Sequence, residues 1–388
     1  MLVRNRWHGL KQGAFMQRSF MRLLIAVLLI SFGLIPKSVS AQSQRVCGGA
    51  KPGYARCHAI VTRGEVSTGP RGYGPADFRA AYSVGGSGAS HVGVVVAYDA
   101  PTLLTDVNTF SRTYGLPGLA ACSSHAQIEC LSKVSQSGGN SLPPANSNWA
   151  VEASLDVESV HGMCPHCRIT LVEARTSSIT NLSTAAETAA RLGADFVSNS
   201  YGGSELGVET TYDERYHKPG VTVIASSGDS GYGTSYPAAS PYVIAVGGTS
   251  LRMQGGTVIS ETAWSGAGSG CSSYEPKPAW QHDVRCLSRS IADVAADADP
   301  STGAAIYDSY PSNGHSGWLN VGGTSLAAPL VTGILASSQQ RSYPLLSLYS
   351  GMKTRDIISG ANGTCAGYPC HALSGYDGPT GVGVLNRW

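Results

Sequence analysis

The chain has 388 residues, a formal net charge of +2 and only 13% charged residues. This balance excludes the strongly basic surface that nucleic-acid binding needs, so we expect no nucleic-acid partner. Residues 42–388 are enough for one large α/β domain with a sizeable core.

Residues 1–41 have the pattern of a secretory signal peptide. Basic residues precede an apolar core at 23–34, and Val39-Ser40-Ala41 supplies small residues before Gln42. The apolar run is shorter than the ~20 residues of a membrane anchor. We therefore expect cleavage after Ala41, a secreted extracellular protein and no stable membrane association afterwards. A retained anchor and a periplasmic location stay open as alternatives.

All ten cysteines follow this leader, and export favours disulfide bonds over free thiols. Proximity in the chain predicts five local pairs, although sequence alone does not fix the connectivity. The Cys164-Pro165-His166-Cys167 motif also leaves a redox or zinc role open, but no second Cys-x-x-Cys accompanies it. The predicted pairs are Cys47 with Cys57, Cys122 with Cys130, Cys164 with Cys167, Cys271 with Cys286, and Cys365 with Cys370.

After the leader, residues 42–72 form a short N-terminal segment without strong periodicity, and a short helix follows at 73–82. Apolar strand-like runs then alternate with helical stretches. This alternation predicts a mainly parallel sheet covered on both faces, with ligands gathering at the carboxyl ends of its strands. We expect strands at 91–98, 168–173, 195–198, 221–226 and 242–246, helices at 105–114, 149–161 and 178–192, a hairpin at 255–256 and a loop at 266–283.

The most informative motif is Gly322-Gly323-Thr324-Ser325-Leu326-Ala327-Ala328-Pro329. A strand is expected at 317–321 and a helix at 329–337, with Pro329 in its first turn. The glycines permit a sharp turn, and the helix directs its N-terminal amides at the Ser325 oxygen. These are the electrostatics of an acyl-transfer nucleophile, although glycine-rich strand-to-helix connections also occur without function.

This motif resembles the Ser-Gly-Thr-Ser-x-x-x-Pro signature of the subtilase superfamily, with Gly322 in place of the first Ser. Two families share the signature. Subtilisin-like enzymes use Asp, His and Ser, whereas the sedolisins, or serine-carboxyl peptidases, use Glu, Asp and Ser with an oxyanion Asp.

Glu152 and Asp156 are four residues apart on an expected helix and so share one face. Adjacent carboxylates repel, so one holds its proton while the other serves as a base. Alone, such a pair is often a solvated helix face. The pair is similar to the Glu-x-x-x-Asp helix of sedolisins, which implies a role in catalysis.

Asp229 follows a strand in Gly228-Asp229-Ser230-Gly231 and resembles the sedolisin oxyanion aspartate. A carboxyl group can stabilise an oxyanion only by donating a hydrogen bond, so Asp229 must be protonated during the reaction. Acidic operation follows. Without the resemblance, an Asx-turn would explain this loop equally well.

A histidine-based triad is the first alternative, because Asp99, His161 and Ser325 occur in the subtilisin order. His161 closes the helix that carries Glu152, and Gly162-Met163-Cys164 follows it instead of the subtilisin pattern. A helix C-terminal histidine that interacts with the dipole explains His161 better.

Near the C-terminus, Asp356-Ile357 and Gly375-Tyr376-Asp377 resemble the sedolisin calcium site. The resemblance implies one structural Ca²⁺, held by the carboxylates of Asp356 and Asp377 and the carbonyls of Ile357, Leu373 and Gly375. These are the oxygen ligands that Ca²⁺ takes. Leu373 stands where the family has Gly.

The resemblance extends from about Tyr73 to Gly383 and implies a subtilisin-like three-layer α/β/α fold. We expect a peptidase domain with a C-terminal calcium-binding loop at 73–388, and no full-size prodomain in residues 42–72. The implied protein is a monomeric serine-type endopeptidase that cleaves proteins or peptides in acid through an acyl-enzyme. The second alternative is a catalytically silent secreted binding protein on the same fold.

Overall fold

The computed structural model describes residues 1, 43–62, 68–123, 127–312, 315–338 and 340–386. The expected signal peptide therefore lies outside the described residues, apart from Met1. Residues 42–388 form one compact unit. No helix in the described ranges is both long and apolar enough to cross a membrane.

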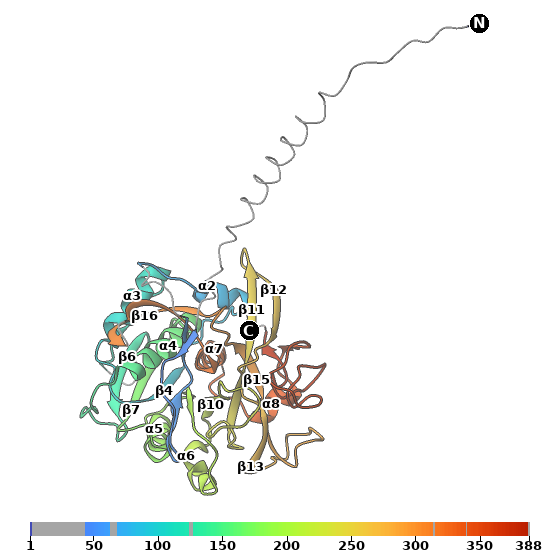
Figure 1. The fold of residues 1–388 in the computed structure, drawn as a ribbon. Coiled ribbons are helices and arrows are strands. Elements are labelled where there is room, and N and C mark those ends of the chain that lie inside the picture. The colour runs from blue at the N-terminus through green and yellow to red at the C-terminus, as the bar shows by residue number, and fades with distance from the viewer. Residues whose placement is uncertain (2–42, 63–67, 124–126, 313–314, 339, 387–388) are drawn as a thin grey trace. The chain divides into compact units, whose positions relative to one another are not determined.

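A mainly parallel sheet lies at the centre of this unit (Figure 1). Its middle strands pair in parallel, with Val92 opposite Phe196 and Val223 opposite Val197. In spatial order the strands are β18 (Thr354–Arg355), β19 (Val384–Leu385), β15 (Val294–Asp297), β11 (Val243–Gln254), β10 (Thr222–Ser226), β8 (Phe196–Asn199), β4 (His91–Ala97), β7 (Arg168–Ala174), β6 (Cys130–Ser135) and β5 (Ala120–Ala121), and β12 (Thr257–Ala263) pairs with β11.

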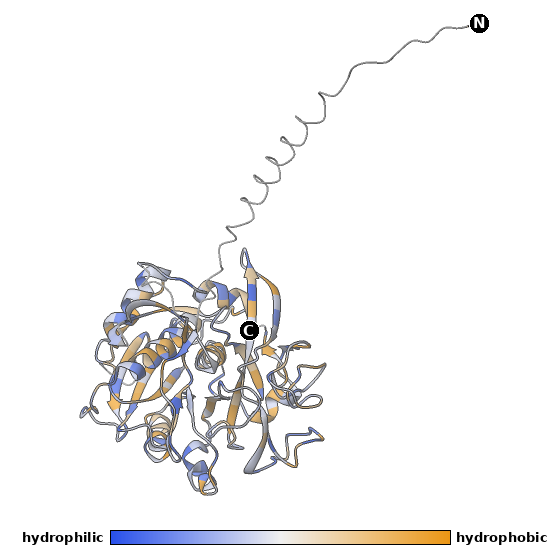
Figure 2. Ribbon diagram, in the orientation of Figure 1, coloured by the Kyte–Doolittle hydropathy of each residue, from blue (hydrophilic) through white to orange (hydrophobic). Residues whose placement is uncertain are grey.

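Helices cover both faces of the sheet. α4 (Ser147–Met163) and α7 (Thr324–Ala336) pack against each other on one face, and α5 (Ile179–Arg191) lies on the other. All of α7 and nearly all of α4 is buried, as expected of helices that are apolar on most sides (Figure 2). The remaining helices in the described residues are α2 (Pro75–Ala81), α3 (Leu103–Tyr114), α6 (Asp213–Tyr216), α8 (Leu345–Ser350) and the 3₁₀ helix η1 (Glu209–Tyr212). This is the three-layer α/β/α fold that the sequence predicts.

Smaller sheets accompany the central sheet. β1 (Ser43–Arg45), β3 (Ile60–Thr62), β17 (His315–Gly322) and β16 (Ala304–Ser312) form a four-stranded sheet in that order. β2 (Arg56–Cys57) pairs with β9 (Tyr201–Gly202), and β13 (Gly270–Pro276) with β14 (Ser288–Ile291). The N-terminal segment thus contributes three strands, two of them beside β17 and β9.

Most of the expected elements are confirmed, with small shifts at their ends. All five predicted disulfide pairs are present. The hairpin at Gly255-Gly256 is also confirmed, and both glycines have positive φ, as a two-residue type I′ turn requires.

Two expectations about local structure are wrong. The expected loop at 266–283 contains strand β13, which pairs with β14. The helix after the serine begins at Thr324 rather than Pro329, so Pro329 lies inside α7. Proline cannot donate to the Ser325 carbonyl one turn earlier, and that carbonyl accepts a hydrogen bond from the Ser200 hydroxyl at 3.4 Å instead.

Candidate active site

Ser325 is the second residue of α7, directly after β17 and the turn at Gly323. Gly323 has φ 94°, and a Cβ there would lie 1.8 Å from the His58 carbonyl oxygen, so only glycine fits. The Ser325 hydroxyl donates to the Ser200 carbonyl at 3.0 Å. Its own N–H belongs to the first helical turn, where amides lack a partner within the helix. The side chain is fully buried.

Glu152 and Asp156 lie one turn apart on α4, and both are fully buried. Neither carboxylate accepts a hydrogen bond of regular geometry among the described residues. Burial raises the pKa of both groups well above the usual range, and the Asp156 charge raises that of Glu152 further. The nearby Ser325 hydroxyl and Ala59 N–H lower the pKa of Glu152. The pair therefore holds a proton beside the serine.

Asp229 follows β10 and reaches the start of α7. Its Oδ1 accepts hydrogen bonds from the Thr324 N–H and hydroxyl, both at 2.8 Å, whereas Oδ2 has no hydrogen-bond partner among the described residues. Burial raises the pKa of Asp229 to about 6, against the effect of Thr324 and of Arg45. Oδ2 lies 3.8 Å from Arg45 Nη1 but accepts no hydrogen bond, so a protonated Asp229 has an oxygen from which it can donate a hydrogen bond to an oxyanion.

The alternative triad is not assembled. Asp99 pairs with Lys133 at 2.5 Å, and the His161 ring hydrogen-bonds to the Pro117 carbonyl at 2.9 Å. Burial lowers the pKa of His161 to about 4. The structure therefore brings Glu152, Asp156 and Asp229 to Ser325 and leaves Asp99 and His161 in contacts of their own.

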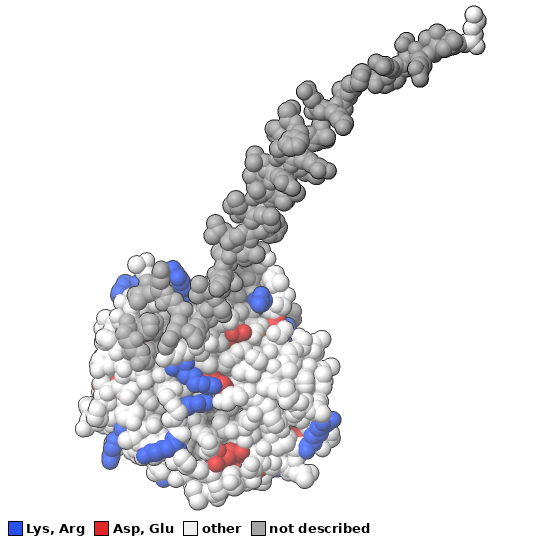
Figure 3. Space-filling view, in the orientation of Figure 1, with Lys and Arg blue, Asp and Glu red and all other residues white. Residues whose placement is uncertain are grey.

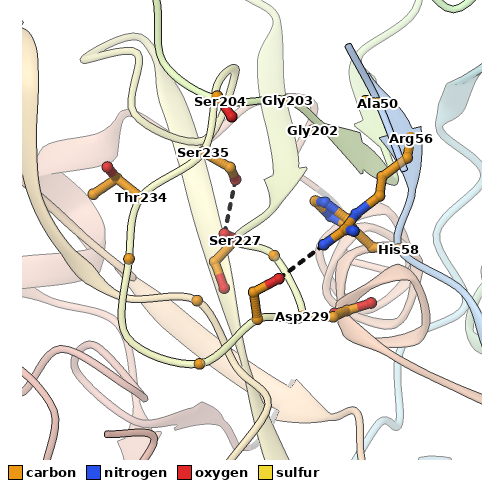
Figure 4. Close-up of a pocket in the computed structure, with 15 residues that line it drawn as sticks. Ala50, Arg56, His58, Gly202, Gly203, Ser204, Ser227, Asp229, Thr234 and Ser235 are labelled. Atoms are coloured by element: carbon orange, nitrogen blue, oxygen red, sulfur yellow. Dashed lines mark hydrogen bonds between the residues drawn. The ribbon is translucent and has the colours of Figure 1, made fainter. Parts of the chain in front are cut away.

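Three residues of the N-terminal segment also reach this site, and the motif analysis missed them: Arg45, Arg56 and His58. Arg56 and His58 line a pocket of about 270 Å³ (Figure 4), and Arg45 donates to the carbonyl of Asp229, another residue of its lining. The β-branched run Ile60-Val61-Thr62 beside Cys57 was the one sequence signal that could have predicted a strand here. The pocket is lined by Ala50, Arg56, His58, Gly202–Ser204, Ser227–Gly231, Gly233–Ser235 and Gly268.

The expected calcium ligands gather around one loop. Asp377 is buried, and its Oδ2 accepts the Leu373 N–H at 3.0 Å, while Asp356 Oδ2 accepts the Gly375 N–H at 2.8 Å. No hydrogen bond in the described part of the chain uses the carbonyl of Ile357, Leu373 or Gly375. No cluster of three or more His, Cys, Asp or Glu side chains of metal-binding type occurs there either. Two carboxylates and three carbonyls are oxygen ligands of the type that Ca²⁺ takes, although Asp377 Oδ1 also accepts hydrogen bonds from the Thr380 N–H and hydroxyl, both at 2.9 Å.

Comparisons with known proteins agree with this geometry. The model of the subtilase family matches residues 139–361, more than half of the chain. The chain belongs to the subtilase family. Among curated proteins, it is 36% identical to sedolisin of Pseudomonas sp. (strain 101) over 43% of this chain and 34% of the relative. It is 28% identical to xanthomonalisin of Xanthomonas sp. (strain T-22) over 80% of this chain and 45% of the relative.

A solved structure of Pseudomonas sedolisin, described as a serine-carboxyl proteinase complexed with two molecules of pseudo-iodotyrostatin, superposes with a TM-score of 0.69. It is 27% identical and covers 82% of this chain and 96% of that chain. Sphericase, at 17% identity and a TM-score of 0.51, shares the fold. This sedolisin-like chain spans less than half the length of the curated relatives described above.

Proposed function

We propose that this protein is a secreted serine-carboxyl endopeptidase that works in acid. The observation that carries the proposal is the burial of three carboxyl groups, from α4 and from the loop after β10, around the Ser325 hydroxyl. Five disulfides in the described residues support export, because such bonds persist outside the cytosol. Figure 3 shows basic and acidic side chains only in scattered places on the face in view. We propose protein or peptide substrates and a monomeric enzyme.

In the proposed mechanism, the Ser325 oxygen attacks the substrate carbonyl while Glu152 takes the hydroxyl proton. The Ser325 N–H and protonated Asp229 donate hydrogen bonds to the developing oxyanion. Glu152 then gives its proton to the leaving amine as the C–N bond breaks. Water, activated by Glu152, hydrolyses the resulting ester, and Asp156 orients Glu152 and shares its proton.

Two requirements confine this mechanism to acid. Asp229 must be protonated, and its pKa of about 6 means that this form is lost as the pH rises above about 6. The Glu152–Asp156 pair must carry one negative charge, so activity also falls when the pair is fully protonated.

The test is the pH profile of cleavage of a quenched peptide library by the wild-type protein, Ser325→Ala, Glu152→Gln and His161→Gln. We expect wild-type activity that peaks in acid, losses of about 10³-fold or more in the first two variants, and an active His161→Gln. A neutral or alkaline optimum that depends on His161 would contradict the carboxylate mechanism. Absence of Ser325-dependent cleavage at every pH would favour the silent binding protein.

We also propose that the loop of Asp356 and Asp377 binds one structural Ca²⁺. The ion would neutralise two neighbouring carboxylates and cross-link the loop to the segment after β18, without taking part in the reaction. Titration of chelated protein with Ca²⁺ should show one site by calorimetry and raise the melting temperature. Asp377→Asn should abolish the heat of binding; an unchanged titration in that variant would exclude this site.

A further inference from the structure

One wall of the pocket beside Asp229 is made of two short segments, Gly203-Ser204 and Gly233–Ser235, here called the pocket wall. A bridge joins the two segments, because Gly203 and the next residue after the second segment, Tyr236, donate their N–H groups to each other's carbonyls, both at 3.0 Å. The pocket wall consists of small residues, so its position depends on what lies behind it.

Two carboxyl groups hold the pocket wall from behind. Glu205, which follows the first segment, accepts hydrogen bonds from the hydroxyls of Thr234 and of Ser272 in β13. Asp213 in α6 accepts a hydrogen bond from the Tyr236 hydroxyl at 2.9 Å. Figure 4 shows Thr234 on the side of the pocket away from Arg56 and His58. Each segment of the pocket wall is thus tied to a carboxyl group outside the pocket.

Two further carboxyl groups lie between these two. Glu209 in η1 and Glu275 in β13 are each 1% exposed. Glu209 Oε2 accepts the Leu206 N–H at 2.5 Å, but Glu209 Oε1 and both oxygens of Glu275 have no hydrogen-bond partner of regular geometry in the described residues. Glu275 lies close to the carboxyl groups of Asp213 and Glu209, and Glu209 lies close to that of Glu205. We call these four residues the carboxyl cluster.

No cation neutralises the carboxyl cluster. Among the described residues, no lysine, arginine or histidine forms an ion pair with any of its members. The other titratable groups that face it are the phenols of Tyr216 and Tyr236 and the exposed carboxyl of Glu214. Burial, with help from the neighbouring carboxyls, raises the pKa of Glu275 to about 8 and that of Glu209 to about 9. These groups therefore hold protons in acid, and a protonated carboxyl can donate a hydrogen bond to its neighbour.

We propose that the carboxyl cluster is a proton-dependent brace of the pocket wall, which holds β13, η1 and α6 together in acid and releases the wall when it ionises, so that peptide binding itself requires acid. Ionisation would place negative charges side by side without a cation, and separation of β13 from η1 relieves their repulsion. The inference rests on the proposed function, because Asp229 lines the same pocket and a peptide bound at Ser325 contacts the pocket wall. The members of the cluster are positioning residues.

The direction of the pH dependence follows from the two states of the pocket wall. When the wall is released, the carboxyls meet water and titrate near their usual pKa of about 4. The braced state holds its protons to higher pH, so it is fully favoured below about pH 4. Above that pH, and up to the pKa in the braced state, each pH unit shifts the equilibrium toward release by up to about tenfold per group. This change acts on KM, whereas protonation of Asp229 acts on kcat.

The test measures KM and kcat of the wild type, Glu275→Gln and Glu214→Gln for one quenched peptide from pH 4 to pH 7. Glutamine keeps the hydrogen bonds of a neutral carboxyl and does not titrate. Glu214 is an exposed carboxylate beside Asp213, so it controls for the loss of one charge. We expect the wild-type KM to rise about tenfold or more from pH 5 to pH 7 and that of Glu275→Gln to rise about threefold or less. Glu214→Gln should follow the wild type, and kcat should fall alike in all three proteins.

A wild-type KM that does not change with pH would overturn the inference, and so would an equal rise in Glu275→Gln or an equally reduced rise in Glu214→Gln. If these comparisons fail while Ser325-dependent cleavage still peaks in acid, the proposed function stands. If no protein cleaves any peptide, the proposed function fails and hydrogen exchange decides whether the brace exists.

Hydrogen exchange in Ser325→Ala tests the brace without catalysis and without depending on the folding of Glu275→Gln. The N–H groups of Gly203 and Tyr236 bond across the pocket wall, so release of the wall should expose both. After correction for the intrinsic effect of pH on exchange, we expect their protection to fall from pH 5 to pH 7 by about tenfold more than that of the amides in β4. An equal fall in the pocket wall and in β4 would mean a general loss of stability and would overturn the inference.

Discussion

In the proposed mechanism, Asp229 is the residue whose protonation state decides whether the candidate site can work. Thr324 satisfies Oδ1 twice, so the proton of the neutral acid can reside on Oδ2, the oxygen that faces the His58 carbonyl. Burial favours this neutral form and raises the pKa to about 6. Burial disfavours the charged form of any aspartate, and here it keeps the Asp229 carboxyl protonated, so that it can donate a hydrogen bond.

Asp229→Asn tests this role. An amide donates a hydrogen bond at every pH, so we expect a variant with kcat/KM about 10²-fold below the wild type at its optimum and no loss of activity at pH 6 to 7. The measurement is the pH profile of kcat/KM for one peptide. If kcat/KM of this variant still falls as the pH rises through about 6, a group other than Asp229 causes that fall.

In the proposed mechanism, the charge of Asp156 sets the pH below which activity falls. Since the Asp156 carboxyl raises the pKa of Glu152, Asp156→Asn should let Glu152 ionise at lower pH. We expect the acid limb of kcat/KM to move down by about one pH unit, with a smaller maximal rate because the proton is no longer shared. A limb that moves up, or stays in place, would show that Glu152 is not the base whose ionisation is measured.

At the scale of elements, the parts of the fold that are buried on both sides could be predicted from the sequence. Parallel central strands are continuous apolar runs, so β4 and β7 were recognisable from composition and length. β13 was not, because its residues are mostly polar and its pairing with β14 is irregular. The strands β1, β2 and β3 are only two or three residues long, which is too short for a periodic pattern.

Residues of the candidate site could likewise be predicted only where a local sequence pattern marks them. Glu152 and Asp156 share a helix face, and Asp229 and Ser325 each follow a strand, so local patterns indicated them. Arg45 and His58 contact residues 184 and 168 positions away in sequence. Such contacts arise when β3 pairs with β17, and no local pattern encodes that pairing.

The segment that ends at β3 leads to a prediction at this scale. Because the His58–Ala59 bond faces Ser325, Glu152 and Asp229, we expect the protein to cut it in acid. Ser325 adds to the His58 carbonyl, the C–N bond breaks, the Ala59 amine leaves with the proton from Glu152, and water frees the His58 carboxyl. Intact mass and N-terminal sequencing after incubation at pH 4 should show a new terminus at Ala59.

Ser325→Ala incubated alone should keep the bond intact. An active wild-type protein whose His58–Ala59 bond stays intact after prolonged incubation would show that the bond is held too firmly, or misaligned, for attack.

At the scale of the whole molecule, the core holds many carboxyl groups whose burial raises their pKa. Burial raises the pKa of Asp308 to about 7 and that of Glu173 to about 8, and it moves those of Glu158 and Asp297 well above the usual range. A carboxyl that is protonated more readily in the folded state stabilises the fold fully below its unfolded pKa near 4. That stabilisation is lost as the pH rises through the folded pKa.

We therefore expect the fold to be more stable in acid than at neutral pH. Each such group loses up to about 1.4 kcal/mol per pH unit inside its window, which for Asp308 lies between about pH 4 and pH 7. Burial lowers the pKa of His58 to about 3 and that of His161 to about 4, so both histidines destabilise the fold as the pH falls below 6.5, but they are two groups against several carboxyls. Thermal unfolding of Ser325→Ala, which avoids self-digestion, should show a melting temperature at least about 5 °C higher at pH 5 than at pH 8. Asp308→Asn should reduce this difference, because its amide does not titrate. A higher melting temperature at pH 8 would mean that ionisation of these buried carboxyls hardly lowers the free energy of unfolding. The need for acid would then come from the candidate active site and not from the stability of the fold.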